Sequence, residues 1–111
     1  MIYLASPYSH ASAVIKDLRY REACRAAGRL MHEGHAVFSP IAHSHAIEQL
    51  FDGAKVEGHD FWLRQDFAIL RHAAKLVVLT LEGWEQSFGV RAEIELATKL
   101  NIPIEYLEPR P

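Results

Sequence analysis

Residues Lys75–Leu81 (KLVVLTL) decide the fold class of this chain, because they form a short and almost wholly apolar run. Such a run is typical of a strand that is buried on both faces of a parallel sheet. Met1–Ala5 (MIYLA) has the same character and leads into Ser6–His10, a polar segment rich in turn-forming residues. The sequence therefore predicts two buried strands of one parallel sheet.

Segments with helical periodicity separate these strands, and two more short apolar runs accompany them. Asp60 is predicted to cap one helix, and Gly34 and Asn101 to close two others. Strands that alternate with helices predict a parallel sheet with right-handed crossovers. We expect helices over Ala13–Glu33, His45–Phe51, Asp60–His72 and Gly89–Leu100, further strands over Ala36–Phe38 and Ile102–Leu107, and a mobile loop up to Gly58.

The pattern as a whole predicts one α/β domain over residues 1–111. We expect a three-layer sandwich with a short parallel sheet of four to five strands, similar to the flavodoxin and Rossmann folds. In the first long helix, apolar residues recur at spacings near 3.6, with charged residues between them. The apolar residues are Val14, Leu18, Ala23, Ala26, Ala27, Leu30 and Met31.

The composition excludes several classes of protein. Of the 111 residues, 50% are apolar and 23% are charged, which is ordinary for a globular domain and argues against disorder. A formal charge of −2 does not provide the dense basic face that nucleic-acid binding requires. Cys24 is the only cysteine, which excludes an internal disulfide framework and a multi-cysteine zinc site. Without a membrane-length apolar run or a signal-peptide pattern, we expect a soluble cytoplasmic protein.

Three loops are the candidate ligand site: Ser6–His10, Ser39–His45 and Glu82–Gly89. In sheets of this kind, ligands bind beyond the carboxyl ends of the strands, where the strand order reverses. Trp84 could stack on a ligand ring there, whereas Trp62 is expected in the core. From these loops and the helix after the last one, we expect substrate contacts by Ser6, Pro7, Tyr8, Ser39, His43, His45, Trp84, Ser87, Gly89 and Arg91.

The segment Ser87–Glu93 (SFGVRAE) is a candidate anion site. Ser87 and Gly89 lie where a helix begins, and the free N–H groups and positive dipole end there favour an anion such as phosphate. Glu93 follows about one turn later, so its carboxylate could face the same crevice. The alternative is that Ser87 merely caps the helix and Glu93 is solvated.

Asp66 and Tyr3 are further candidates, each with a structural alternative. Asp66 lies beside the apolar stripe of its predicted helix, so it is either a solvated charge or a functional acid whose pKa is raised by partial burial. Tyr3 lies inside an apolar strand, where a buried phenol needs a hydrogen-bond partner. A carboxylate from a neighbouring element would meet that need.

The seven histidines raise the alternative of a metal site, with His43, His45 and His59 as the candidate ligands. No HExxH motif or Cys/His spacing is present, and His43 and His45 would share a face only on a strand. We therefore favour contacts of loop histidines with a nucleobase, sugar or phosphate, and expect no metal.

These motifs resemble the nucleoside 2-deoxyribosyltransferase-like superfamily, most closely its branch of small uncharacterised bacterial and phage domains (DUF1937-like). The resemblance implies that Glu93 is the nucleophile, that Asp66 protonates or orients the departing base, and that Tyr3 holds the Glu93 carboxylate. The residues that carry it span nearly the whole chain: Ile2–Tyr8 (IYLASPY), Gly34-His35-x-Val37-Phe38-Ser39-Pro40-Ile41, Asp66, Ala73, Ser87-x-Gly89-Val90-x-x-Glu93, Ala97 and Ile102-Pro103-Ile104.

The resemblance implies cleavage of the N-glycosidic bond, or base exchange, on a nucleoside or nucleoside 5′-monophosphate through a covalent glycosyl-Glu93 intermediate. Ser87 stands where the deoxyribosyltransferases usually have an aspartate. In this respect the chain looks more like the nucleoside 5′-monophosphate N-glycosidases, whose serine contacts the phosphate. Glu95 replaces a small residue, and a carboxylate there would perturb the pKa of Glu93 or crowd the pocket.

We expect no cofactor. The resemblance implies a homo-oligomer, a dimer or larger, in which a neighbour completes the pocket. The alternative function is a non-catalytic nucleotide-binding or signal-sensing module of the same fold. Free base released from a nucleotide distinguishes the enzyme from the module.

Overall fold

The sheet is parallel and four-stranded, in the order β2-β1-β3-β4. Its strands are β1 (Ile2–Ala5), β2 (Val37–Phe38), β3 (Lys75–Leu79) and β4 (Ile104–Leu107). The computed structural model describes residues 1–51 and 58–110, so the mobile loop expected up to Gly58 falls largely outside the described residues. Within them, the predicted α/β fold with a flavodoxin-like or Rossmann-like sandwich is confirmed.

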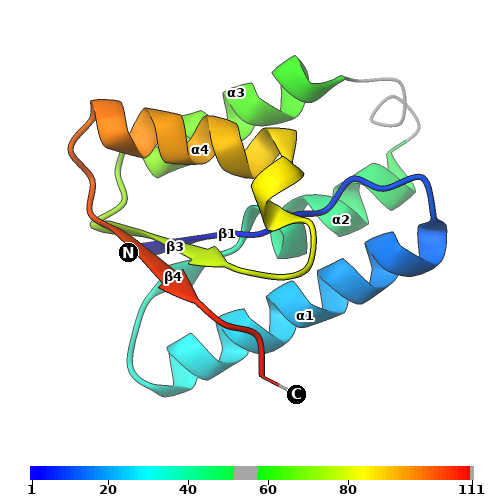
Figure 1. Ribbon diagram of the computed structural model, residues 1–111, viewed down its shortest axis with the longest axis horizontal. Helices are drawn as coiled ribbons and strands as arrows, with labels where there is room; N and C mark the ends of the chain where they lie inside the picture. Colours follow the sequence, from blue (N-terminus) through cyan, green and yellow to red (C-terminus); the bar gives the residue numbers. More distant parts are fainter. Residues whose placement is uncertain (52–57, 111) are drawn as a thin grey trace.

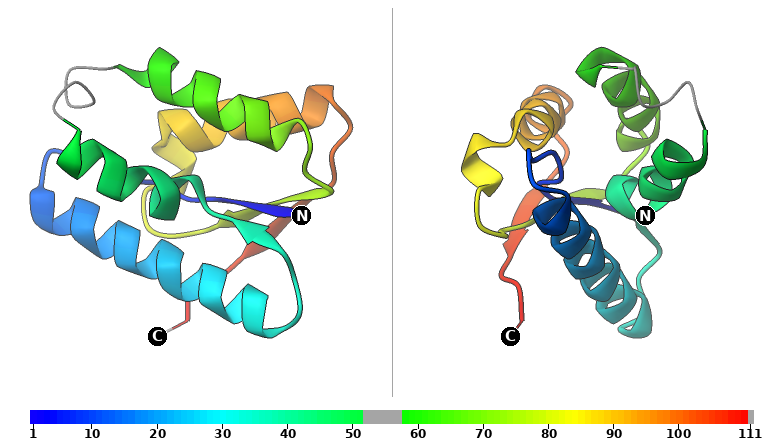
Figure 2. Two further views of the ribbon diagram at one scale, coloured as in Figure 1. Left: turned by 180° about the vertical axis from the view of Figure 1, so that it is seen from behind. Right: turned by 90° about the vertical axis from the view of Figure 1, so that its right-hand side faces the viewer.

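Helices cover both faces of this sheet (Figure 1). Helix α1 lies on one face, while α3 and α4 lie side by side on the other, and α2 packs beside α1 and β1 (Figures 1 and 2). The chain moves from β1 to β2 toward one edge of the sheet, and in its later connections it moves toward the other edge. Because all crossovers have the same hand, reversing the direction puts the connecting helices on the opposite face. The helices are α1 (Ala13–His32), α2 (Pro40–Leu50), α3 (His59–Leu70) and α4 (Phe88–Lys99), with a short 3-10 helix, η2 (Trp84–Gln86).

Each face of the sheet has its own apolar core. On the α1 face, Ala23, Ala26 and Ala27 are buried against the sheet, and their small side chains let the helix backbone approach closely. On the other face, Leu70 from α3 joins Val90 and Ala97 from α4. Val14, Leu18 and Met31, which contribute to the apolar periodicity of α1, are more than half exposed.

The predicted start of α2 was also wrong. The helix begins at Pro40, so Ser39 and His43 do not lie in a loop. Ser39 is its N-cap and accepts a hydrogen bond from the backbone N–H of Ala42 at 3.1 Å. A proline that ends a strand suits the first position of a helix equally well, because its φ is preset and no N–H partner is needed there.

Three further helix boundaries depend on single residues. The N-cap of α3 is Gly58 and not Asp60. Asp60 lies in the first turn, where its negative charge interacts favourably with the positive end of the helix dipole. Gly34 and Asn101 have the left-handed conformation predicted for them, with φ of 101° and 57°.

In the described part of the chain, no helix combines the length and apolarity needed to cross a membrane.

Candidate active site

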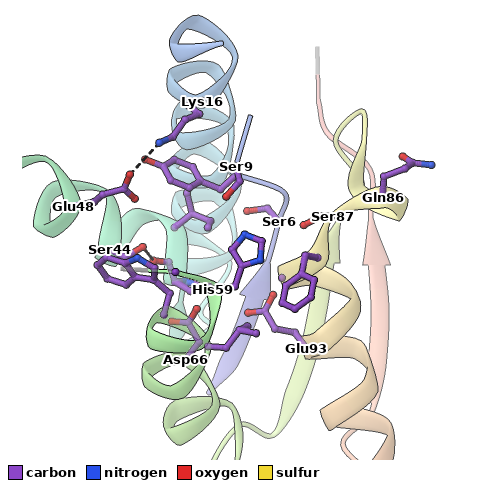
Figure 3. Close-up of a pocket in the computed structure, with 18 residues that line it drawn as sticks. Ser6, Ser9, Lys16, Ser44, Glu48, His59, Asp66, Gln86, Ser87 and Glu93 are labelled. Atoms are coloured by element: carbon purple, nitrogen blue, oxygen red, sulfur yellow. Dashed lines mark hydrogen bonds and ion pairs between the residues drawn. The ribbon is translucent and has the colours of Figure 1, made fainter. Parts of the chain in front are cut away.

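A cavity of about 590 Å³ lies at the carboxyl ends of the central strands, within the size range of small-molecule sites. Its walls are formed by the segment after β1, the N-terminal part of α1, helices α2 and α3, and η2 with the N-terminal end of α4 (Figure 3). β1 and β3 are neighbours in the sheet, but the chain continues from β1 to β2 at one edge and from β3 to β4 at the other edge. Sheets of this kind bind ligands at the point between two such strands. The polar side chains of its lining are Ser6, Tyr8, Ser9, Lys16, Ser44, Glu48, His59, Asp66, Gln86, Ser87 and Glu93.

Glu93 is a buried carboxyl group in the wall of this cavity, with 4% of its surface exposed. It follows Val90 by three residues and precedes Ala97 by four, so α4 places it on the stripe that faces the sheet. From β1, the hydroxyl of Tyr3 donates a hydrogen bond to Oε2 of Glu93. The resemblance implied this contact, and it fixes the orientation of the carboxyl group.

The pKa of Glu93 is raised to about 8, chiefly by burial and to a smaller extent by the charge of Asp66, while the hydrogen bond from Tyr3 opposes the rise. Burial, together with the nearby carboxylates of Glu93 and Asp66, also raises the pKa of Tyr3, so this phenol stays protonated and remains a donor.

Asp66 approaches the same cavity from α3, and its carboxyl group lies near that of Glu93 in Figure 3. Burial raises the pKa of Asp66 to about 7. Two partly protonated carboxyl groups from facing helices can supply one carboxylate and one acid at neutral pH. Strongly shifted carboxyl groups that line a cavity are typical of functional sites.

The N-terminal end of α4 forms another part of the wall. Oγ of Ser87 accepts a hydrogen bond from the N–H of Val90 at 3.2 Å, and the two preceding N–H groups of the helix, those of Phe88 and Gly89, have no partner in an α-helical hydrogen-bond pattern. A Cβ added at Gly89 would meet no atom within 4 Å, so ligand can approach this backbone closely. Oγ of Ser6 is buried and has no hydrogen-bond partner among the described residues. These groups together could hold an oxyanion.

Lys16 and Glu48 form another side of the cavity, where Nζ of Lys16 lies 3.0 Å from Oε1 of Glu48. Nζ of Lys16 also lies 4.9 Å from the centre of the Tyr8 ring. The Tyr8 hydroxyl is hydrogen-bonded to Nδ1 of His45 at 2.7 Å, and the His45 ring stacks on Tyr20 with centroids 3.8 Å apart. Burial, followed by the charge of Glu48, raises the pKa of Tyr8 to about 12.

Several predicted site residues lie together and others do not. Ser6, Tyr8, Ser87 and Gly89 line the cavity beside the two carboxyl groups. Pro7 is buried in the core, Ser39 caps α2, and Arg91 is exposed, so these three are not among the lining residues.

The predicted aromatic and histidine contacts are distributed differently from the expectation. His43 lies against Phe38, and His45 does not line the cavity but is hydrogen-bonded to Tyr8, which does. Trp84 packs on Tyr106 at 5.5 Å and on the core, whereas Trp62, expected in the core, lines the cavity. Among residues 1–51 and 58–110, no three His, Cys, Asp or Glu side chains are grouped to hold a metal ion.

The sequence interpretation missed Lys16, Ser44 and Glu48. Pro40, Ser44 and Glu48 recur every four residues on α2, a signal that the wrong helix start concealed. Glu95 does not crowd the pocket as expected: it is 71% exposed and pairs with Lys99 at 3.5 Å. Because α4 turns by about 200° between them, positions 93 and 95 point to opposite sides of the helix.

A model of the family described as domain of unknown function DUF1937 matches residues 1–108. The chain belongs to the DUF1937 family. The match includes every side chain named above as lining the cavity. No curated protein matches the chain.

Proposed function

We propose that this DUF1937 protein cleaves the N-glycosidic bond of a nucleoside 5′-monophosphate, or of a nucleoside, by double displacement at Glu93. The observation that carries the proposal is the buried Glu93 carboxyl group at the cavity wall, held by Tyr3 and accompanied by Asp66. The proposal includes membership of the nucleoside 2-deoxyribosyltransferase-like superfamily, with which the chain shares the motifs described above.

In the first step, an oxygen of the Glu93 carboxylate forms a bond to the anomeric carbon, and the bond from that carbon to the base nitrogen breaks. This step uses the form in which Glu93 is the carboxylate and Asp66 holds the proton, the less populated of the two singly protonated forms, because the pKa values are about 8 for Glu93 and about 7 for Asp66. Asp66 then donates its proton to the departing base and becomes the carboxylate. In the second step, Asp66 takes a proton from water as the water oxygen attacks the anomeric carbon, which releases the sugar and regenerates the Glu93 carboxylate. A second base in place of water gives base exchange.

The end of the cavity at α4 fits a 5′-phosphate. The dianion would accept hydrogen bonds from the N–H groups of Phe88 and Gly89 and from the hydroxyl groups of Ser6 and Ser87. An uncharged serine at position 87 avoids the repulsion that an aspartate would exert on phosphate. Ser6 gains a partner for a hydroxyl group that is otherwise buried without one.

The cellular setting belongs to the same proposal: a cytoplasmic homo-oligomer, without a metal or organic cofactor, that acts on a small nucleotide. Leu18 and Leu50 are 54% and 84% exposed, and burying such side chains against a second copy of the chain would favour self-association. Light scattering on the purified protein would test this, with a molecular mass of at least twice that of the chain expected.

The test is base release from a panel of ribo- and deoxyribonucleosides with and without a 5′-phosphate, measured by chromatography. We expect turnover, which Glu93→Gln lowers at least a thousandfold, on the scale of losing a nucleophile. Glu95→Gln is the matched control, since it makes the same change two residues away on an exposed side chain. No base release from any substrate of the panel would reject the enzymatic proposal.

A nucleotide-binding module is the second candidate, and the raised pKa of Glu93 favours it. With a pKa of about 8, this carboxyl group is mostly protonated at neutral pH and would donate a hydrogen bond instead of attacking carbon. A nucleotide that raises the melting temperature and is recovered unchanged would support the module. Recovery of free base from the same sample would support the enzyme.

A further inference from the structure

Lys16 and Glu48 form an ion pair whose position in the cavity wall is not explained by stability. The pair lies across the cavity from Glu93 in Figure 3, and its side chains are 28% and 22% exposed. Solvent-accessible ion pairs of this kind contribute little to folding. Both groups also keep unused hydrogen-bonding capacity: within the described residues, Lys16 donates only to Oε1 of Glu48, and Oε2 of Glu48 has no partner.

Aromatic side chains hold this pair in place. The ammonium of Lys16 lies over the Tyr8 ring, the Tyr8 hydroxyl is fixed by His45, and His45 is stacked on Tyr20. A lysine normally loses much rotamer freedom when it binds a ligand. Here the contacts with Tyr8 and Glu48 have already restricted Lys16, so the cost of ordering it on binding is lower.

The order of atoms along the pair defines a recognition pattern. Nζ of Lys16 is a donor beside Oε1 of Glu48, and Oε2 is the second acceptor of the same carboxylate, so the pair offers a donor, an acceptor and a second acceptor in that order. The Watson–Crick edge of guanine presents the complement in the same order: the O6 acceptor, the N1–H donor and the N2–H donor. A carboxylate that accepts two parallel N–H bonds is a strong and specific arrangement.

We infer that Lys16 and Glu48 select a guanine base, an inference that rests on the proposed N-glycosidase function. Uracil and thymine would place a carbonyl oxygen against Oε2 of Glu48, which is repulsive. Adenine and cytosine can satisfy only two of the three groups. Pro40, Ile41, Trp62 and Leu63 supply apolar surface in the same cavity for the faces of the base ring.

The first experiment compares base release from GMP, AMP, CMP and UMP and from their 2′-deoxy forms. We expect kcat/KM for the guanine nucleotide to be at least tenfold higher than for any other base with the same sugar, since one bidentate contact discriminates by about that factor or more. Equal rates, or a preference for another base, would overturn the inference while leaving the proposed function intact.

Substitution of Glu48 tests the residue assignment. Glu48→Gln replaces one acceptor by a donor, and we expect the ratio of kcat/KM for GMP to that for AMP to fall at least fivefold. Glu105→Gln is the matched control. Oε1 of Glu105 lies 3.2 Å from Nζ of Lys75, so the change also removes a Lys–Glu pair between two elements, but Glu105 does not line the cavity. A general loss of structure would lower both rates together and leave the ratio unchanged, which would count against the assignment.

Binding separates failure of this inference from failure of the proposed function. Dissociation constants of GMP and AMP are measured by calorimetry on the native protein and on Glu48→Gln. If no nucleotide is cleaved but GMP binds at least tenfold tighter than AMP, and Glu48→Gln removes that difference, base selection stands and the enzymatic proposal fails. If there is neither cleavage nor a preference for GMP, both are overturned.

Discussion

The two faces of the sheet carry different kinds of side chain, although the same short strand contributes to both. In β1, Ile2 and Leu4 point toward α1, while Tyr3 and Ala5 point toward α3 and α4. The buried cluster on the α1 face is wholly aliphatic among the described residues. On the opposite face, Tyr3 meets Glu93 at the edge of the cavity. The alternation of a strand thus separates the aliphatic core from the candidate site, and substitutions on the two faces should have separable effects.

The largest expected effect is the pH dependence of stability caused by Glu93. Its folded pKa of about 8 exceeds the ordinary value of 4.5, so its protonated form stabilises the fold at low pH, and this contribution is lost as the pH rises toward 8. Glutamine at position 93 does not titrate. As the pH rises from 5 to 9, we therefore expect the free energy of unfolding of Glu93→Gln to increase by roughly 4 kcal/mol relative to that of the native protein. Urea denaturation at several pH values measures the free energy of unfolding of both proteins. If this free energy depends on pH in the same way in both, Glu93 is not a buried carboxyl group that titrates in this range.

The second effect concerns the aliphatic face. Leu4 is fully buried, so Leu4→Ala should lower the free energy of unfolding by about 2–5 kcal/mol through lost burial and the cavity it leaves. Because Leu4 points away from the cavity side chains, base release per folded molecule should stay within about twofold. A large loss of turnover in protein shown to be folded by circular dichroism would contradict the separation of the two faces.

Tyr3→Phe tests the other face of the sheet, because Tyr3 is next to Leu4 in β1 but points toward the cavity side chains. The change removes the hydrogen bond to Glu93 that lowers the pKa of this carboxyl group, so the pKa rises and less carboxylate is present at neutral pH. We expect kcat at pH 7 to fall roughly 10- to 100-fold, typical of losing a positioning hydrogen bond. The acidic limb of the pH–rate profile should move to higher pH. An unchanged limb would show that Tyr3 has no influence on the reacting group.

The smallest effect concerns the contact that joins α1 to the loops at the cavity. Arg19 donates to the carbonyl oxygens of Ser9 and Glu82 at 2.9 and 3.1 Å, and a Cβ on Gly83 would lie 2.6 Å from its Nη2. Gly83 also has φ of 88°, so Gly83→Ala should destabilise by roughly 1–2 kcal/mol. Gly28→Ala, in open space on α1, should instead stabilise by roughly 0.5–1 kcal/mol. Melting temperatures that shift in the same direction for both variants would contradict this account.

The fold could be predicted from the sequence because its signals are local. Lys75–Leu81 and Met1–Ala5 are contiguous apolar runs, and the helices between them bury small residues at regular spacing. The contact of Tyr3 with Glu93 was implied by the resemblance together with residue chemistry. A phenol in an apolar strand needs a buried partner, and a carboxyl group on a following helix is available.

The remaining features depend on contacts between segments that are distant in the sequence. Pro40 fits both the end of a strand and the start of a helix, and only tertiary structure selects between them. Trp84 packs on Tyr106 because β4 lies next to β3, and Trp62 lines the cavity because α3 forms one of its walls. No local pattern in the sequence reveals either arrangement. The pairing of Lys16 with Glu48 likewise requires the contact of α1 with α2.

The most direct test of the central claim is the covalent intermediate at Glu93. A nucleoside 5′-monophosphate with fluorine at the 2′ carbon destabilises the positive charge that develops on the sugar, which slows the hydrolysis of a glycosyl ester. Mass spectrometry of the intact protein and its peptides should find one added sugar phosphate per chain on the peptide that contains Glu93, and none in Glu93→Gln. Base release without an adduct, or an adduct on another residue, would contradict the role assigned to Glu93.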